Sequence, residues 1–308
     1  MTGAFGVRKS PILLLVHVLI LTGLLAACGS STKTASSSVD NPATLTLAIS
    51  SVEGSQQLQK QFGPLQAKLT KILHMPVKLF PVADRTAAAA AIESNHLDLV
   101  MAGPAEYVAL RAESGTLPVV GLSQPGYRTL WVVHGGSAIT SLAQLKGKAV
   151  GLTDPGSTSG YVYPLKMLLD AGLKPGSTVT TQPLSSNQAA AFLGHKVDAV
   201  ATYPAGYAAL LKLGGLTPQQ APVIARSPMF PPNLIIANPR LSASLRNRIK
   251  SELSANSAAI MKSIQAAGGI YVSSYAESKI IPVTDKDFDM IRQAYRQDGY
   301  PNLAKIPS

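Results

Sequence analysis

The segment AVGLTDPGSTSGYVYPLKMLL, residues 149–169, contains the pattern that decides how this chain folds. An apolar strand-like run, Ala149–Leu152, leads through Asp154–Gly160 into a helical pattern with Pro164 in its first turn, where a missing N–H costs little. Hydroxyls and unpaired backbone N–H groups converge at such a helix start, and the helix dipole adds partial positive charge there. The segment therefore predicts either an oxyanion-binding turn or a helix that Ser157 merely caps.

The rest of the chain alternates short apolar strands with amphipathic helices. This order predicts an α/β fold of two lobes, each a mixed, mostly parallel sheet flanked by helices. The expected strands are 45–49, 77–82, 97–101, 118–122, 129–134, 149–152, 178–183, 197–203, 223–225 and 234–237. The expected helices are 57–73, 87–93, 105–113, 161–171, 188–193, 205–213, 242–267 and 285–296.

Two segments share one pattern, Leu97–Pro104 and Val197–Pro204. In each, an aspartate precedes a buried strand, which ends at a turn with proline that opens a helix. Open α/β sheets place ligands at the carboxyl ends of strands, beside such helix starts. The pattern predicts a ligand cleft between the lobes, and two ordinary strand–turn–helix junctions are the alternative.

Length and charge limit the class of protein. A chain of 308 residues is longer than one typical hydrophobic core requires, so we expect two lobes. Lobe 1 is expected to comprise 44–132 plus 234–308, and lobe 2 to comprise 133–233. The hinge is expected near 132–135 and 230–234. The net charge of +11 favours anions, although solubility or an anionic membrane surface would also explain it. No basic run is interleaved with aromatic residues, so nucleic acid is not an expected partner.

The N-terminus has the features of a secretory signal peptide. Arg8 and Lys9 precede an apolar run, 12–25, that is too short for a spanning helix, so residues 1–27 are expected to be removed. The small residues before Cys28 resemble the lipobox of bacterial lipoproteins, which implies lipidation of Cys28, and a free structural cysteine is the alternative. Cys28 is the only cysteine, so no intramolecular disulfide forms. Residues 28–43 then read as a flexible lipid-anchored tether.

The sequence does not predict an enzyme. The histidines beyond the signal peptide lie apart, without an HExxH pattern or cysteine ligands, so we expect no metal and no other cofactor. The serines near Gly160 lack the spacing of a nucleophile elbow.

The motifs taken together resemble the substrate-binding proteins of phosphate, phosphite and phosphonate ABC importers, a branch of the type II periplasmic binding protein-like fold. The resemblance extends from about residue 45 to about residue 296 and is strongest over Ile139–Gly160. Asp98, Gly103–Tyr107 and Ile281–Phe288 add support. By this resemblance the two-lobed fold closes on a small ligand between its lobes.

The resemblance implies which residues bind the ligand. Ser157, Thr158 and Ser159, followed by Gly160, would hold the phosphorus-bound oxygens through hydroxyls and backbone N–H groups. Tyr127 stands where the family has an aromatic hydroxyl directed at the ligand.

Two positions depart from the family pattern. Asn187 stands where the family often has histidine, and it can donate a hydrogen bond without carrying charge. Arg85 stands where the family often has tyrosine, and in the cleft it would bind an oxyanion bidentately. The alternatives are that Asn187 is a helix cap and that Arg85 is a solvated residue.

By the same resemblance, binders of aminoalkyl phosphonates use acids in the second lobe to meet the ligand ammonium. The corresponding stretch here, 202–207, contains no carboxylate, so we expect phosphate, phosphite or methylphosphonate rather than an aminoalkyl phosphonate. The resemblance implies an extracytoplasmic monomer, lipid-anchored to the cell membrane on the periplasmic side or the outer surface, that delivers its ligand to an ABC permease and ATPase. The alternatives are a sensor subunit of the same fold and a binder of a sulfonate or other organic ligand.

Overall fold

The computed structural model describes residues 38–49, 54–82 and 87–298. The predicted signal peptide 1–27, Cys28, most of the tether, and Arg85 lie outside these ranges. In the described ranges no helix is both long and apolar enough to cross a membrane.

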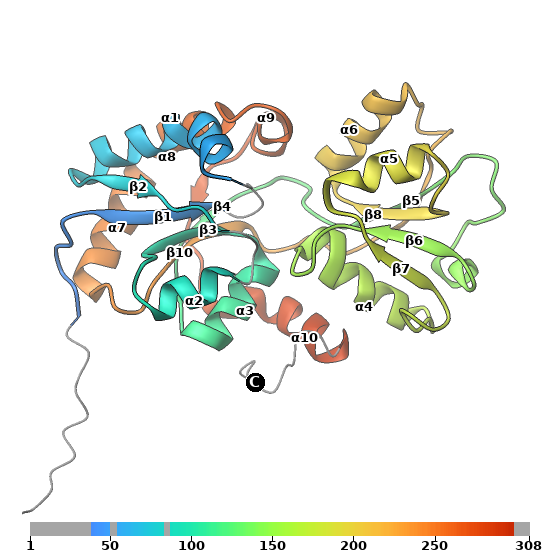
Figure 1. Ribbon diagram of the computed structural model, residues 1–308, viewed down its shortest axis with the longest axis horizontal. Coiled ribbons are helices and arrows are strands. Elements are labelled where there is room, and N and C mark those ends of the chain that lie inside the picture. The colour runs from blue at the N-terminus through green and yellow to red at the C-terminus, as the bar shows by residue number, and fades with distance from the viewer. Residues whose placement is uncertain (1–37, 50–53, 83–86, 299–308) are drawn as a thin grey trace, which may run out of the picture. The chain divides into compact units, whose positions relative to one another are not determined.

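The first sheet has six strands in the order β11-β4-β10-β3-β1-β2 (Figure 1). Their bounds are β1 Leu45–Ile49, β2 Val77–Leu79, β3 Leu99–Ala102, β4 Leu117–Leu122, β10 Asn233–Ala237 and β11 Ile280–Ile281. Strand β1 runs parallel to β2 and β3, whereas β10 runs antiparallel to β3 and β4. The helices around this sheet are α1 Ser55–Leu73, α2 Ala87–Glu93, α3 Pro104–Ser114, α7 Ala243–Ala255, α8 Ser257–Gln265, α9 Ile270–Ser274 and α10 Asp289–Asp298. We call these elements the first lobe.

The two faces of the first sheet bury different residues, because successive side chains of a strand point to opposite faces. Leu47 and Ile49 of β1 pack in the cluster that contains the buried faces of α1, α7 and α8. Ala48 packs instead in the cluster that contains α2, α3 and α10. Helices therefore cover both faces of this sheet.

The second sheet has five strands in the order β7-β6-β8-β5-β9. Their bounds are β5 Leu130–Val133, β6 Ala149–Leu152, β7 Thr180–Pro183, β8 Ala199–Thr202 and β9 Val223–Arg226. Its helices are α4 Tyr163–Asp170, α5 Gln188–Leu193 and α6 Pro204–Gly214. Leu130 and Val132 pack with α5 and α6, whereas Trp131 and Val133 pack in the cluster that contains α4. We call these elements the second lobe.

Two segments connect the sheets: residues 123–129, between β4 and β5, and residues 227–232, between β9 and β10. The segments are hydrogen-bonded to each other. The Phe230 N–H donates to the Tyr127 carbonyl at 2.9 Å, and the Ser227 N–H donates to the Thr129 carbonyl at 3.1 Å. The chain thus crosses as a paired ribbon, which brings side chains of both segments to one place.

The structure shifts the first connection relative to the sequence expectation. The expected boundary at 132/133 falls inside β5, whose four residues all pair with β8 or β9 of the second sheet. An apolar run identifies a strand, but only its hydrogen-bonding partners decide which sheet it joins. The sheets are also less parallel than expected. The first has three antiparallel and two parallel strand pairs, and the second has two of each. The reason is that β5 and β10 each run antiparallel to both of their neighbours.

Helix bounds differ from expectation in the last third of the chain. The helix expected over 242–267 is divided into α7 and α8 at Asn256, which has φ −108° and ψ 24°. Ser242 caps α7 by accepting a hydrogen bond from the Leu245 N–H at 3.1 Å. The short helix α9 was not expected.

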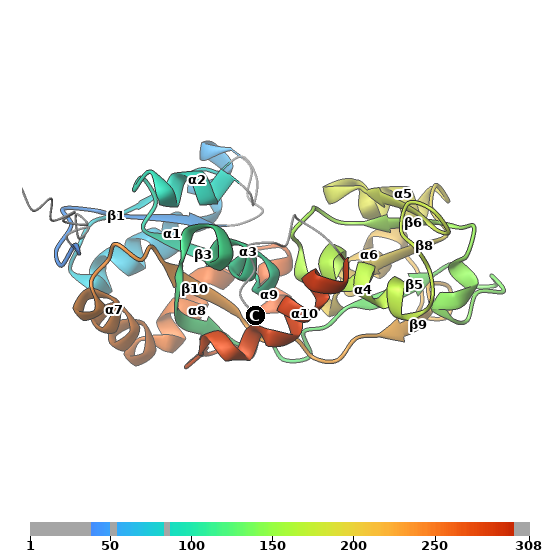
Figure 2. The ribbon, with the colours of Figure 1, turned by 90° about the horizontal axis from the view of Figure 1, so that it is seen from below.

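One cluster of buried residues continues from the first lobe to the second through α10, which packs against both α3 and α4 (Figure 2). The Tyr295 hydroxyl donates to the Ala105 carbonyl of α3 at 3.1 Å. Near the end of α10, Gln297 Nε2 donates to Asp170 Oδ1 of α4 at 2.6 Å. The C-terminal helix is therefore part of the contact between the lobes.

Candidate ligand-binding site

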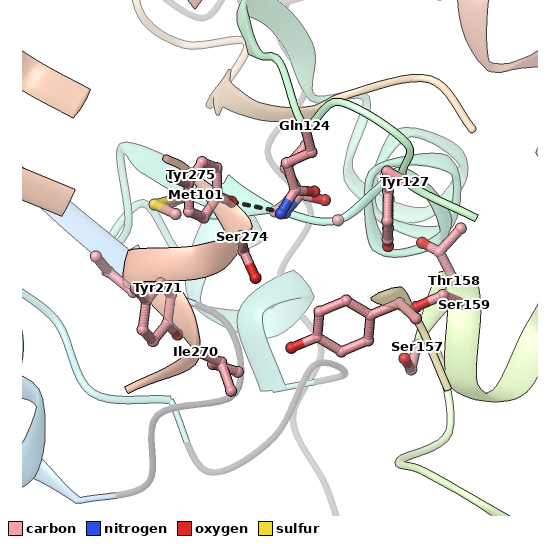
Figure 3. Close-up of a pocket in the computed structure, with 15 residues that line it drawn as sticks. Met101, Gln124, Tyr127, Ser157, Thr158, Ser159, Ile270, Tyr271, Ser274 and Tyr275 are labelled. Carbon is pink, nitrogen blue, oxygen red and sulfur yellow. Dashed lines mark hydrogen bonds between the residues drawn. The ribbon is translucent and has the colours of Figure 1, made fainter. Parts of the chain in front are cut away.

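A cavity of about 140 Å³ lies where the crossing segment 123–129 meets the start of α3, the helix α9 and the start of the helix that follows β6 (Figure 3). Its fifteen described lining residues are Ile49, Met101, Ala102, Gly103, Gln124, Tyr127, Ser157, Thr158, Ser159, Tyr203, Asn233, Ile270, Tyr271, Ser274 and Tyr275. Both lobes and the crossing segment 123–129 contribute, so the site exists only in the folded chain. Four of the predicted ligand-binding residues are among the fifteen: Tyr127 and Ser157–Ser159.

The Ser157 hydroxyl makes no capping hydrogen bond. Ser157 has an extended backbone, φ −68° and ψ 126°, and the helix begins after it with a π-helical turn, Thr158–Val162. The Ser157 carbonyl accepts from the N–H groups of Tyr161 at 3.1 Å and Val162 at 2.8 Å. The helix start therefore uses the backbone of Ser157 and leaves its side chain at the cavity.

Thr158 links the two lobes. Its Oγ1 accepts a hydrogen bond from the Ala105 backbone N–H at 2.9 Å, and this bond is buried. Ala105 lies in the first turn of α3, where the backbone N–H groups have no hydrogen-bond partner within the helix. Because the oxygen accepts this bond through a lone pair, the hydroxyl proton of Thr158 remains available to a ligand.

Ser159 is hydrogen-bonded to the crossing segment 123–129. The Thr129 hydroxyl donates to the Ser159 carbonyl at 2.9 Å, and both residues are buried. The Thr129 N–H in turn donates to Ser227 Oγ at 2.9 Å. The serine turn is thus fixed in place by buried contacts before any ligand arrives.

Gly160 does not line the cavity, and the structure gives it a packing role. A Cβ atom at this position would lie 2.1 Å from Thr153 Oγ1 and 2.7 Å from Thr153 Cγ2. The Thr153 N–H donates to the Gly160 carbonyl at 2.8 Å. Only glycine allows the strand end and the helix start to approach this closely.

Asn187 is exposed and is absent from the described cavity lining. Its neighbour Gln188 is buried, and the Gln188 amide donates to the carbonyls of Gly151 at 3.0 Å and Ala201 at 2.9 Å. Because Gln188 turns its side chain inward to β6 and β8, the preceding residue faces outward. The structure does not bring Asn187 to this cavity, and Arg85 falls outside the described residues.

An aromatic group borders the cavity. The Tyr127 ring meets Phe230 at a centroid distance of 5.3 Å and an angle of 78°, and meets Tyr203 at 6.4 Å and 88°. Phe230 also contacts Tyr163 of α4 at 4.8 Å. These edge-to-face contacts fix the orientation of Tyr127, whose hydroxyl points toward the serine turn in Figure 3.

Several polar lining residues were not expected from the sequence. Gln124 follows β4 just before the Pro125-Gly126 turn, and Asn233 begins β10 after Pro231-Pro232. Flanking turn residues were the only sequence signal at either position. Ser274 and Tyr275, at the end of α9, had no signal because their partners lie far away in the sequence.

The half-buried Asn233 is paired with the buried Tyr275. Asn233 Nδ2 donates to the Tyr275 hydroxyl oxygen at 2.7 Å. Burial raises the pKa of Tyr275 well above its usual value, so this phenol stays protonated. The pair thus holds the Asn233 amide in one position at the cavity.

The described lining residues carry no charged side chain. Positive potential at the cavity comes instead from helix starts, at Gly103 before α3 and at Ser157 before the helix after β6. Within the described residues, no group of three or more His, Cys, Asp or Glu side chains is placed to hold a metal ion. The site offers neutral hydroxyl, amide and backbone groups.

Comparison with known proteins gives a consistent result. The family model described as "ABC transporter, phosphonate, periplasmic substrate-binding protein" matches residues 47–287. The chain is 27% identical over 294 residues to the phosphate-import protein PhnD of Mycolicibacterium smegmatis, covering 87% of this chain and 90% of that protein.

Two solved structures have a similar fold. A binding protein component of an ABC phosphonate transporter from Pseudomonas aeruginosa is 21% identical with a TM-score of 0.67, covering 84% of this chain and 87% of that one. PhnD1 from Prochlorococcus marinus, in complex with methylphosphonate, is 20% identical with a TM-score of 0.66, covering 83% of this chain and 98% of that one.

The two sheets and the polar cavity between them define a type II periplasmic binding protein, as the fold class predicted. The chain belongs to the family of periplasmic substrate-binding proteins of phosphonate ABC transporters. The predicted family is thereby confirmed, and with it an extracytoplasmic location and a role in binding rather than catalysis.

Proposed function

We propose that the chain is the substrate-binding lipoprotein of an ABC importer, and that its cavity captures a small phosphorus oxyanion such as phosphate, phosphite or a simple phosphonate. The observation that carries this proposal is the turn Ser157–Ser159, which lines the cavity at a helix start while the Ser157 hydroxyl makes no cap bond. Hydroxyl and backbone N–H donors at a helix start are well suited to a tetrahedral anion.

The composition of the cavity supports a ligand without an amine. No carboxylate is among the described lining residues, so a ligand ammonium would find no negatively charged partner there. The relative from M. smegmatis is named for phosphate import, and PhnD1 was solved with methylphosphonate. Both names fit a small oxyanion at the serine turn, with the Tyr127 hydroxyl as a further donor.

Closure of the lobes would complete the site. The proposed lobes meet at the Thr158–Ala105 hydrogen bond and at α10, and the crossing segments 123–129 and 227–232 would act as the hinge. A ligand that binds donors from both lobes favours the closed form, which the permease and its ATPase would recognise. Arg85 would add a bidentate contact if it faces the cavity on closure.

The membrane anchor is a separate part of the proposal. Cys28 would carry the lipid, and residues 28–43 would tether a monomeric binding protein to the membrane. Replacement of the lipid-accepting residue, Cys28→Ser, should release the protein from the membrane fraction. Retention of the Cys28→Ser variant in that fraction would contradict lipid anchoring.

Calorimetry tests the ligand class. Every described element lies after Gly29, so the chain beginning there retains both sheets. This protein would be titrated with phosphate, phosphite, methylphosphonate, 2-aminoethylphosphonate, sulfate and methanesulfonate. We expect a phosphorus oxyanion to bind most tightly and Ser157→Ala to weaken it by about tenfold, the loss of one hydrogen bond. The control Ser177→Ala changes an exposed serine away from the cavity. Tightest binding of a sulfonate, or an unchanged affinity in Ser157→Ala, would overturn the proposal.

A further inference from the structure

Two amide oxygens in the cavity have no hydrogen-bond donor. Gln124 Oε1 and Asn233 Oδ1 are both buried, and neither accepts a hydrogen bond from the residues that the structure describes. Both residues line the cavity. Buried polar atoms in folded proteins nearly always have a partner, so two unsatisfied acceptors in one cavity indicate that a ligand supplies the donors.

The two amides lie at the ends of neighbouring strands. Gln124 lies two residues after the end of β4, and Asn233 pairs in register with Leu122, the last residue of β4. Figure 3 shows the Gln124 side chain directed into the cavity from above the serine turn. The acceptors therefore form one patch on the first-lobe side of the site.

This patch lies close to the donor side. A Cβ atom built on Gly103 would lie 3.8 Å from Asn233 Oδ1 and 3.5 Å from Thr158 Oγ1. The carboxamide oxygen and the threonine hydroxyl thus border the same glycine. A ligand small enough for a cavity of about 140 Å³ would meet both at once.

The Tyr275 contact occupies one end of the Asn233 amide. Nδ2 donates to the Tyr275 oxygen at 2.7 Å, so Oδ1 is the end that remains for a ligand. Tyr275 is 2% exposed and lies among buried residues of the first lobe. The amide is therefore held by the protein core rather than by the ligand.

An amide oxygen can only accept. It repels an ionised phosphorus-bound oxygen and pairs with a P–OH group. The hydroxyls of Ser157, Ser159 and Tyr127 supply the donors that an ionised oxygen needs. The cavity thus offers donors to one side of the ligand and acceptors to the other.

We propose that the site selects the singly charged, protonated form of its phosphorus oxyanion, with Asn233 Oδ1 and Gln124 Oε1 accepting from P–OH groups. This inference rests on the proposed function and names the protonation state that the cavity takes. The monoanion of phosphate has two P–OH groups, which matches the two acceptors, and the monoanion of methylphosphonate has one. Sulfate and alkylsulfonates have none near neutral pH, and are rejected because they leave both acceptors unpaired.

Calorimetry over a pH series tests this selection. The association constant for methylphosphonate, measured from about pH 6 to about pH 9, should fall by up to about tenfold per pH unit above the ligand's second ionisation, because the competent fraction falls by that factor. Above that ionisation, binding should take up one proton, seen as a dependence of the heat on the buffer. Sulfate and methanesulfonate should bind at least about a hundredfold more weakly than methylphosphonate at neutral pH.

Two variants assign the effect to the amides. Gln124→Met and Asn233→Leu remove the acceptors at similar size, and each should reduce the pH dependence and the discrimination against sulfate. Circular dichroism would confirm that each variant is folded. The control Gln219→Met changes an exposed glutamine outside the cavity and should behave as the natural protein does.

The possible results separate this inference from the proposed function. If phosphonate binds with an affinity that is constant or rises with pH, the amides present donors to the fully ionised ligand, and the inference is wrong while the proposed function stands. Equal binding of sulfate would likewise overturn the inference. If no phosphorus oxyanion binds at any pH, both proposals fail.

Discussion

The Thr158 hydroxyl accepts a hydrogen bond of 2.9 Å from the backbone N–H of Ala105, across the junction of the two lobes. One side chain of the proposed anion site therefore also satisfies the first turn of α3. Ligand binding and the contact between the lobes share this group, so a change at Thr158 should affect both.

Thr158→Val removes the shared hydroxyl and keeps the side-chain shape. We expect the affinity for the oxyanion to fall by about tenfold to a hundredfold, and the unfolding free energy to fall by about 1–3 kcal/mol because the Ala105 N–H loses its partner. Calorimetry and urea unfolding measure the two effects. Thr158→Ser keeps the hydroxyl and should restore most of both. A Thr158→Val variant with unchanged affinity would reduce the turn to a structural element.

Gly160→Ala should disturb the turn without changing any proposed ligand contact. The new Cβ would meet Thr153 Oγ1 at 2.1 Å, and relief of such an overlap typically costs about 1–3 kcal/mol. Urea unfolding should show this loss together with weaker ligand binding. Adding Thr153→Ala removes the nearest atoms, so the double variant should recover part of the stability. Failure of the second change to help would mean that the clash is not the cause.

Asn187 and Gln188 should respond in opposite ways. Asn187→Ala removes an exposed side chain outside the described cavity lining, so we expect ligand affinity to change by less than about twofold and stability by less than about 0.5 kcal/mol. Gln188→Ala removes two buried hydrogen bonds and should cost about 2–3 kcal/mol. A large loss of affinity in Asn187→Ala would show that the residue reaches the ligand in another conformation.

The Arg240–Asp98 ion pair should matter for stability and not for binding. Asp98 is 1% exposed, and its Oδ1 accepts from Arg240 Nη2 at 2.6 Å and from Nε at 3.2 Å. Arg240→Ala leaves this buried carboxylate without its counter-charge, which should lower the unfolding free energy by about 3 kcal/mol. Arg248→Ala, at an exposed position, is the control. Equal unfolding midpoints for the two variants would contradict this account.

Acid should destabilise the second lobe through His134. Its ring stacks between Phe192 at 4.0 Å and His195 at 4.1 Å, and burial lowers the pKa of His134 below its usual 6.5. Because the pKa is lower in the folded state, the unfolded chain binds more protons than the folded one. The contribution of neutral His134 to the unfolding free energy is therefore fully present above about pH 6.5 and is lost as the pH falls. The urea midpoint should decrease between about pH 7 and about pH 5. His134→Phe should show a smaller decrease, whereas His74→Gln, at an exposed position, should follow the natural protein.

Local patterns in the sequence were sufficient for the fold class. Strand runs such as Leu45–Ile49 and Ala149–Leu152 were predicted at their observed bounds, because alternating or continuous apolar residues reflect burial within a single strand. The turn Asp154–Gly160 indicated a helix start with hydroxyls for the same reason, since every atom of that feature is close in the chain. The family resemblance over Ile139–Gly160 was likewise local.

Features that depend on partners distant in the chain were not accessible in this way. The position of β5 in the second sheet, the break in the last long helix and the outward direction of Asn187 all follow from packing against other elements. Gln124 lies more than a hundred residues before Asn233 and Tyr275 in the chain, and only the pairing of β10 with β4 and the packing of α9 bring the three to one cavity.

The sequence by itself thus determined the strands, the helix start and the chemistry of the serine turn, because each depends on neighbouring residues. The tertiary structure alone decided what faces that turn. The crossing segment 123–129 and the start of β10 place unsatisfied amide oxygens opposite the serine hydroxyls in a small cavity, and side chains so far apart in the chain meet only when the sheets have formed.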